Sequence, residues 1–98
     1  MPTIIRLYKE QKHLLVSDQV GRAQVRAARA LLDWTQPDLA AAADIAVATL
    51  KRFEIGHSKP IKTVKTAIVR ALEAEGIEFL KDRKRAFVSL EIKKLRKS

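Results

Sequence analysis

The sequence predicts a mainly α fold, with four to five short helices followed by a C-terminal β-hairpin. Hydrophobic residues make up 47% of the 98 residues, and only three Gly and three Pro interrupt them, which is a globular composition. From residue 19 to residue 76 the apolar positions recur with helical spacing, and beyond Ile77 they alternate as in strands. The length allows a single domain. Its expected parts are an N-terminal arm or short strand (residues 1–18), the helical domain (residues 19–76) and a C-terminal hairpin with a tail (residues 77–98).

Residues 19–32 predict the first helix. Val25, Ala28 and Leu32 lie at i, i+3 and i+7, which places them on one helical face. No helix breaker follows Gly21, and we expect the helix to end at Asp33 and Trp34.

A second helix is predicted to begin at Gln36. Thr35 is a suitable N-cap, Pro37 is accepted in a first helical turn, and Asp38 completes an imperfect capping box. The expected inner face is small and apolar, and consists of Leu39, Ala40 and Ala43.

A third helix is predicted from Ala46 to Ile55, after a short linker centred on Asp44. Ala46, Leu50 and Phe53 share one face, and Gly56 supplies a left-handed C-cap. At 100° per residue the opposite face turns outward. That face comprises Ala48, Lys51, Arg52 and Ile55, with Val47 beside it.

A fourth helix follows the segment GHSKP and closes at Gly76. Its apolar stripe has the i, i+3, i+4, i+7, i+8 spacing of an amphipathic helix and consists of Val64, Ala67, Ile68, Ala71 and Leu72.

The alternating segments IEFL and AFVSLEI predict a hairpin joined by KDRKR. A helix from Arg83 onward is the alternative, because it would align Val88, Ile92 and Leu95. Residues 1–18 are open to two interpretations: a poorly ordered arm, or a short strand at TIIRLY that pairs with the hairpin.

Two short helices joined by about three residues describe a helix-turn-helix, whose second helix docks in the major groove of DNA. The run T-Q-x-x-L-A-x-x-A, followed by A-T-L-x-R-x-E-x-G, resembles the Cro and lambda-repressor-like (XRE) helix-turn-helix family over residues 22–80. The resemblance implies a bundle of four or five helices that binds operator DNA, usually as a dimer.

The resemblance also implies which residues meet DNA. Because family members read bases from the start of the third helix, the candidate base-reading residues are Val47, Ala48, Lys51 and Arg52. The family uses a Gln at the start of the second helix to hold a phosphate, which here is Gln36, with Thr35 beside it. Lys59 and Lys62 are further candidates for phosphate contact, or else plain surface lysines.

A structural pair is implied as well. Arg29 and Glu54 match a partly buried ion pair that ties the first helix of this family to the third.

Four positions depart from the family pattern. Asp33 and Asp44 replace the usual glycines at the first helix end and in the turn, and Asp tolerates a left-handed conformation better than most residues. Ala46 replaces a Ser or Thr cap, which weakens the helix start by about 1 kcal/mol. Val47 stands where many members carry a polar reader.

The net charge of +9 is concentrated at the C-terminus, because residues 81–98 carry +6 of it while residues 36–60 are neutral. Such a basic tail either contacts phosphates or a protein partner, or keeps the protein soluble.

The sequence gives no support for an enzymatic or a metal-binding function. There is no Cys, and the two histidines, His13 and His57, lie far apart without a carboxylate cluster, so neither a metal site nor a cofactor is expected. No apolar run reaches the roughly 20 residues of a membrane span. We therefore expect a cytoplasmic, nucleoid-associated protein that is not an enzyme.

The sequence thus predicts a sequence-specific DNA-binding transcriptional regulator that acts as a homodimer on a palindromic operator. Small single-domain members of the family most often repress by occupying a promoter, so we expect a repressor. The hairpin of residues 77–93 is the predicted dimer contact, because its edge and the apolar Phe87, Val88 and Leu90 need cover. One alternative is an antitoxin, whose N-terminal arm or C-terminal hairpin binds a protein partner. The other is a non-specific nucleic-acid binder that uses the basic tail.

Overall fold

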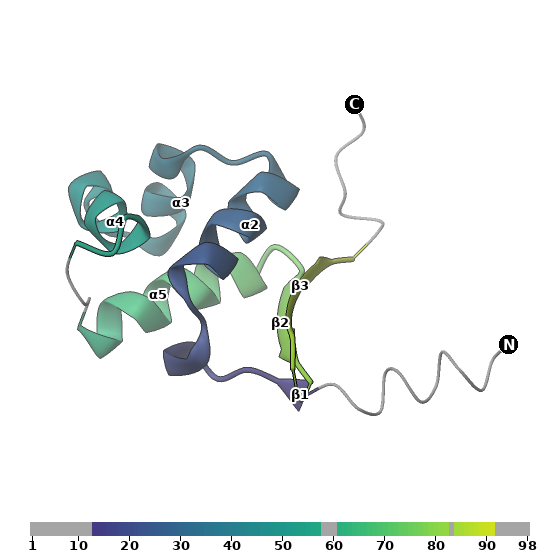
Figure 1. The fold of residues 1–98 in the computed structure, drawn as a ribbon. Coiled ribbons are helices and arrows are strands. Elements are labelled where there is room, and N and C mark those ends of the chain that lie inside the picture. Colours follow the sequence, from purple (N-terminus) through teal and green to yellow (C-terminus); the bar gives the residue numbers. More distant parts are fainter. Residues whose placement is uncertain (1–12, 58–60, 83, 92–98) are drawn as a thin grey trace, which may run out of the picture.

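Four α-helices on one side of a small antiparallel sheet make up the described part of the chain, as the computed structural model shows for residues 13–57, 61–82 and 84–91 (Figure 1). In chain order the elements are β1 (His13–Leu14), the 3-10 helix η1 (Ser17–Gln19), α2 (Arg22–Leu32), α3 (Gln36–Ala43), α4 (Val47–Glu54), α5 (Lys62–Glu73), β2 (Ile77–Lys81) and β3 (Ala86–Leu90). The predicted fold class, mainly α with a C-terminal hairpin, is confirmed.

Helix α2 begins three residues later than predicted, because residues 17–19 form a separate 3-10 turn. The Gln24 side chain accepts a hydrogen bond of 3.0 Å from the Gly21 backbone N–H and so caps the helix start. The helix ends at Asp33, whose left-handed backbone (φ 58°) closes it without a glycine.

The prediction for α3 is confirmed at its start. Thr35 is the N-cap, and its hydroxyl accepts from the Asp38 backbone N–H at 3.2 Å while the Asp38 carboxylate accepts from the Thr35 N–H at 2.9 Å. These reciprocal bonds satisfy two backbone donors that a helix end leaves without partners.

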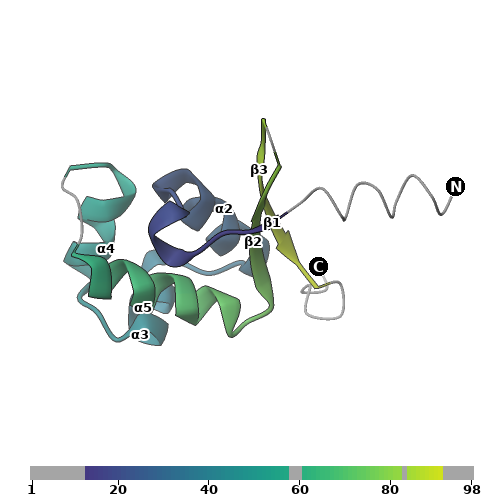
Figure 2. The same ribbon diagram turned by 90° about the horizontal axis from the view of Figure 1, so that it is seen from below.

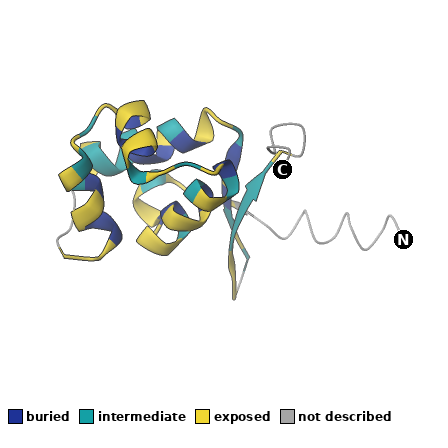
Figure 3. Ribbon diagram, turned by 90° about the horizontal axis from the view of Figure 1, so that it is seen from above, coloured by how far each residue is buried: buried dark blue, intermediate teal, exposed yellow. Residues whose placement is uncertain are grey.

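The apolar faces of the four helices meet in one core (Figure 3). The predicted inward residues of α2, α3 and α5 are buried or packed against the core, and Leu50 and Phe53 of α4 are buried. Ala46 is the exception: the prediction that it points inward is wrong, because it is the exposed N-cap that precedes α4. Ile45 and Val47, its neighbours, pack against the core instead.

The sheet has the order β1–β2–β3, and both pairings are antiparallel. Helix α2 packs on β3 and α5 packs on β2, so the helices cover one face of the sheet (Figure 2), and Ile77 and Phe79 of β2 are buried. The hairpin prediction is confirmed over residues 77–90, so the alternative of a helix from Arg83 is wrong there.

Short β1 lies beyond the segment TIIRLY in which a strand was considered, and that segment lies outside the described residues. Leu14 of β1 and Val16, two residues after the strand end, are 67% and 60% exposed.

The predicted need of Phe87, Val88 and Leu90 for cover is met in part within the chain. Val88 and Leu90 are half-buried against the core, and Phe87 lies half-buried on the opposite face of the sheet. No helix within the described residues has both the length and the apolar character needed to cross a lipid bilayer.

Candidate nucleic-acid interface

Helices α3 and α4 are joined by a tight turn. Asp44 takes the left-handed conformation (φ 57°), and the Asp44 and Ile45 N–H groups donate to carbonyls of the last turn of α3. Because Asp tolerates this conformation and Ile45 then packs on the core, the turn forms without the glycine expected there. The two helices therefore have the connection of a helix-turn-helix.

The start of α4 has no side-chain cap. Ala46 accepts hydrogen bonds from the Thr49 and Leu50 N–H groups through its carbonyl, but its side chain offers no acceptor to the first turn. This leaves free backbone donors at the helix start, next to Val47, which is half-buried, and Ala48, which is exposed.

The solvent-facing side of α4 is both basic and apolar. Ala48, Lys51 and Arg52 are exposed, and Ile55, just after the helix, is 71% exposed. The opposite side holds Leu50, Phe53 and Glu54, all buried. The outward set inferred from helical spacing thus lies together on one surface, and its two basic side chains stand in the last turn of the helix.

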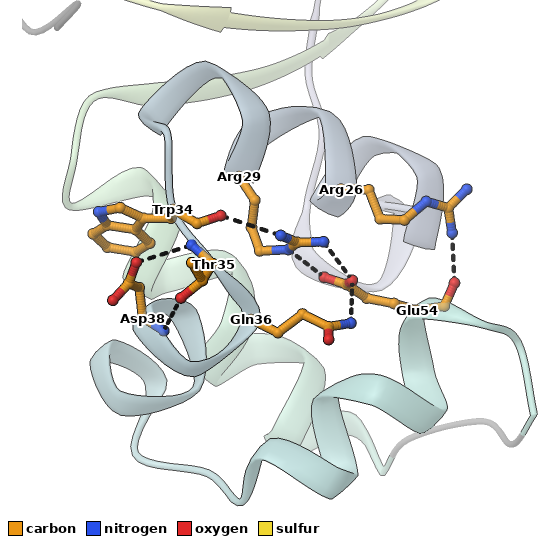
Figure 4. A network of polar contacts seen from close by, with 7 residues as sticks. All are labelled: Arg26, Arg29, Trp34, Thr35, Gln36, Asp38 and Glu54. Atoms are coloured by element: carbon orange, nitrogen blue, oxygen red, sulfur yellow. Dashed lines mark hydrogen bonds and ion pairs between the residues drawn. The ribbon is translucent and has the colours of Figure 1, made fainter.

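Glu54 is the centre of a polar network that fixes the buried side of α4 (Figure 4). Its carboxylate accepts from Arg29 Nε and Nη2, each at 2.8 Å, and from Gln36 Nε2 at 3.0 Å. Arg29 Nη1 also donates to the Trp34 carbonyl at 3.1 Å. The Arg29–Glu54 pair that the family resemblance implied is therefore present, with Glu54 only 2% exposed.

Sequence reasoning missed two arginines of α2 that contact the end of α4. Arg26 donates to the Glu54 backbone carbonyl, which satisfies an acceptor of the last turn. The Arg22 guanidinium lies directly over Gly56, whose φ is +74°, so that a Cβ at that position would overlap it. The signal was available, because Arg22, Arg26 and Arg29 share one helical face at i, i+4 and i+7.

The two residues predicted to hold a phosphate at the start of α3 are already hydrogen bonded within the protein. Thr35 belongs to the capping box with Asp38, and one amide proton of Gln36 is used by Glu54. The backbone and side-chain hydrogen bonds with Thr35 hold the pKa of the exposed Asp38 carboxyl below its usual value. A carboxylate therefore stands beside the predicted anion site, and its charge opposes a phosphate there.

Of the two lysines predicted to contact the DNA backbone beside the site, one lies within the described residues and the other does not. Lys62 is exposed at the first residue of α5, whereas Lys59 lies outside the described residues.

Within the described ranges no group of three His, Cys, Asp or Glu side chains could hold a metal ion. No family model matches the chain, and no curated protein matches its sequence.

Proposed function

We propose that the protein is a sequence-specific DNA-binding transcriptional regulator, which inserts α4 into the major groove of double-stranded DNA. The observation that carries the proposal is the exposed face of α4. Lys51 and Arg52 can donate to guanine O6 and N7, while the exposed Ala48, with the half-buried Val47 beside it, can make apolar contact with a thymine methyl group. The tight turn after α3 gives this helix the setting of a second helix in a helix-turn-helix.

The polar network supports the same proposal. Discrimination between bases requires donors that are held in place before DNA arrives, because side chains that must be ordered on binding lose entropy. Glu54 connects α4 to α2 through Arg29 and Arg26 and to α3 through Gln36. This is a strong positional constraint for a helix of eight residues.

Phosphate contacts position the reading helix in this proposal. Thr35 retains its hydroxyl proton and Gln36 a second amide proton that a phosphate can accept, although the charge of the neighbouring Asp38 carboxylate weakens such a contact. Lys62, and Lys59 beyond the described residues, would contact the flanking backbone. Such contacts set register and orientation without carrying sequence information.

We further propose that the protein acts as a homodimer on a palindromic operator and represses by occupying it, which would place it at the nucleoid. A reading surface of four residues addresses only a few base pairs, and a dimer doubles the site through two half-sites about one helical turn apart.

The proposal is tested by selecting bound sequences from a random pool of duplex DNA. The wild-type chain should enrich a motif with two inverted half-sites. The double variant Lys51→Ala/Arg52→Ala should lose the motif yet retain weak, salt-sensitive binding. The matched control, Arg70→Ala/Lys81→Ala, removes the same charge from exposed positions outside α4 and should enrich the wild-type motif. Enrichment of the same motif by the α4 variant would refute the assignment.

A second candidate is non-specific binding through the basic C-terminus, favoured by the exposed Lys84 and Arg85 at the hairpin turn. Deleting residues 92–98 leaves β3 intact and removes four basic residues. If these residues meet phosphates, the dependence of log K on log salt should flatten by about 0.9 per lost contact. An unchanged slope would exclude phosphate contact by this segment.

A further inference from the structure

The outer face of the sheet, on the side away from the helices, carries a row of large apolar side chains. Phe79 of β2 is buried in the core, and side chains alternate between the two faces of a strand, so Leu80 points to the outer face. Leu80 pairs with Leu14 of β1 on one side and with Phe87 of β3 on the other. Because directly paired residues share a face, these three side chains form one row across all three strands.

The described helices leave this row without cover, because all four lie on the other side of the sheet (Figure 2). Leu14 is 67% exposed, and Leu80 and Phe87 are half-buried. Contiguous apolar side chains at a surface, unlike single ones, indicate a place where another segment packs. The outer face is therefore a candidate docking surface.

The N-terminal part of the chain joins the sheet at this row. Residues 1–12 lie outside the described part of the chain and lead into His13, the residue before Leu14. The segment TIIRLY (residues 3–8) has four large apolar side chains among six residues. Residues 9–12 separate it from β1, and four residues span at most about 14 Å. Since the row is two strand spacings wide, about 10 Å, TIIRLY can reach every part of it.

We propose that TIIRLY docks on the outer face of the sheet of its own chain and covers this row. His13 pairs with Lys81, so the N-terminal residues leave β1 at the end of the sheet where β2 meets the hairpin turn. In the docked state the chain turns back within residues 9–12 and crosses the face toward the start of β2. Burial of the apolar side chains against the row stabilises the docked state.

The charges on the outer face favour this direction. Glu78 lies two residues before Leu80 on the same face and is exposed, whereas the exposed Arg85 lies beside the hairpin turn. Arg6 stands between the apolar residues of TIIRLY, and its long stem can cover apolar surface while its guanidinium reaches a carboxylate. A segment that runs from the turn toward Glu78 brings Arg6 to that carboxylate and away from Arg85.

The C-terminal residues 92–98 fit the row less well. Their sequence, IKKLRKS, has two large apolar side chains and four cations among seven residues. TIIRLY has four large apolar side chains and one cation, so it buries more apolar surface and brings less charge to the contact.

This inference goes beyond the proposed DNA-binding function and does not depend on it, because docking is measured without DNA. The first experiment uses a single introduced thiol, since the chain contains no Cys. Ser89→Cys replaces a half-buried residue opposite Glu78 with a side chain of similar size. Its alkylation rate should rise about tenfold when Leu7→Ser/Tyr8→Ser is added to the full chain, because the cover is lost.

Two controls match these changes. Lys9→Ser/Gln11→Ser alters the linking residues instead of TIIRLY and should leave the alkylation rate of Ser89→Cys unchanged. Ser17→Cys, at a half-buried position of η1, should react at the same rate with and without Leu7→Ser/Tyr8→Ser.

The second experiment tests the direction of the segment. In the Ser89→Cys chain, Arg6→Glu and Glu78→Arg each set like charges together and should each raise the alkylation rate about threefold. The double variant Arg6→Glu/Glu78→Arg should restore the protection. Glu75→Arg, at an exposed position just before β2, makes the same change of charge and should have no effect.

Four results would overturn the proposal. The first two are an alkylation rate that Leu7→Ser/Tyr8→Ser leaves unchanged, and a double charge variant no better protected than its single parents. The third is protection that only Ile92→Ser/Leu95→Ser removes, because the C-terminal residues would then cover the row. The fourth is protection that falls on dilution, because a second copy would then supply the cover.

Discussion

The two ends of this molecule are held together by different forces. At the α4 end the buried residue Glu54 connects three helices: its carboxylate accepts from Arg29 and Gln36, and its backbone carbonyl accepts from Arg26. At the sheet end the contacts are apolar, with Ile77 and Phe79 buried in the core where α5 packs on β2 and α2 on β3. Polar contacts have strict geometry and give up much of their energy to desolvation, whereas apolar burial stabilises without fixing direction. The α4 end is thus built for position and the sheet end for stability.

The largest loss of stability should come from the sheet end. Phe79 is 1% exposed, so Phe79→Ala removes a buried ring and leaves a cavity. The expected loss in the free energy of unfolding is about 3 to 5 kcal/mol, measured by urea titration. Phe87→Ala, on the other face of the sheet, should cost clearly less. Equal losses would show that the face beneath the helices is not the main core.

Disrupting the network at the α4 end should lower the free energy of unfolding nearly as much, and it should also reduce the discrimination between DNA sequences. Arg29→Met leaves the Glu54 carboxylate buried without its bidentate partner, a loss of about 3 kcal/mol. Sequence discrimination by α4 should fall even at temperatures where the variant is fully folded. Arg70→Met, at an exposed site on α5, should change stability by less than about 0.5 kcal/mol. Equal stability and equal sequence discrimination in the two variants would show that the network does not hold α4 in position.

Substitutions at two helix N-caps should change the free energy of unfolding by smaller amounts and in opposite directions. Thr35→Ala removes the acceptor for the Asp38 N–H and should cost about 1 kcal/mol. Ala46→Ser adds an acceptor where the backbone already has the extended conformation of an N-cap (φ −68°, ψ 141°). It should gain up to about 1 kcal/mol in thermal unfolding. A loss on Ala46→Ser would indicate that the start of α4 has another constraint.

The smallest effect concerns pH. The pKa of Asp38 is lowered in the folded state below its ordinary value of 3.8, because of its hydrogen bonds with Thr35. Its contribution to stability is therefore present at neutral pH and is lost as the pH falls below that value through the folded-state pKa. In Asp38→Asn this part of the acid-induced loss should disappear, as measured by unfolding between neutral and acid pH. An unchanged acid profile would show that the cap is not charge-dependent.

Local signals predicted most of the fold. Caps and helical spacing located α3 and α5, and alternation located the hairpin, because these features depend on neighbours along the chain. The two-residue β1 was missed, since so short a strand has no periodicity. Ala46 was assigned inward because helical spacing was extended one residue beyond the helix start, where the backbone is no longer helical.

The candidate site was predictable only in part. The outward face of α4 was predicted from the helical rotation of 100° per residue, and the Arg29–Glu54 pair was predicted from the family resemblance. The Gln36 amide on Glu54 and the Arg26 guanidinium on the Glu54 carbonyl depend on how separate elements pack. Sequence spacing within one element cannot reveal such contacts.

The central claim is that α4 reads base sequence, and binding to a selected half-site duplex against mixed-sequence DNA at fixed salt tests it most directly. We predict that wild type prefers the selected duplex by at least 10³-fold. Lys51→Ala/Arg52→Ala should reduce this ratio to near one, while Arg70→Ala/Lys81→Ala should keep it. A wild-type ratio near one, or a ratio that survives the loss of Lys51 and Arg52, would contradict the account.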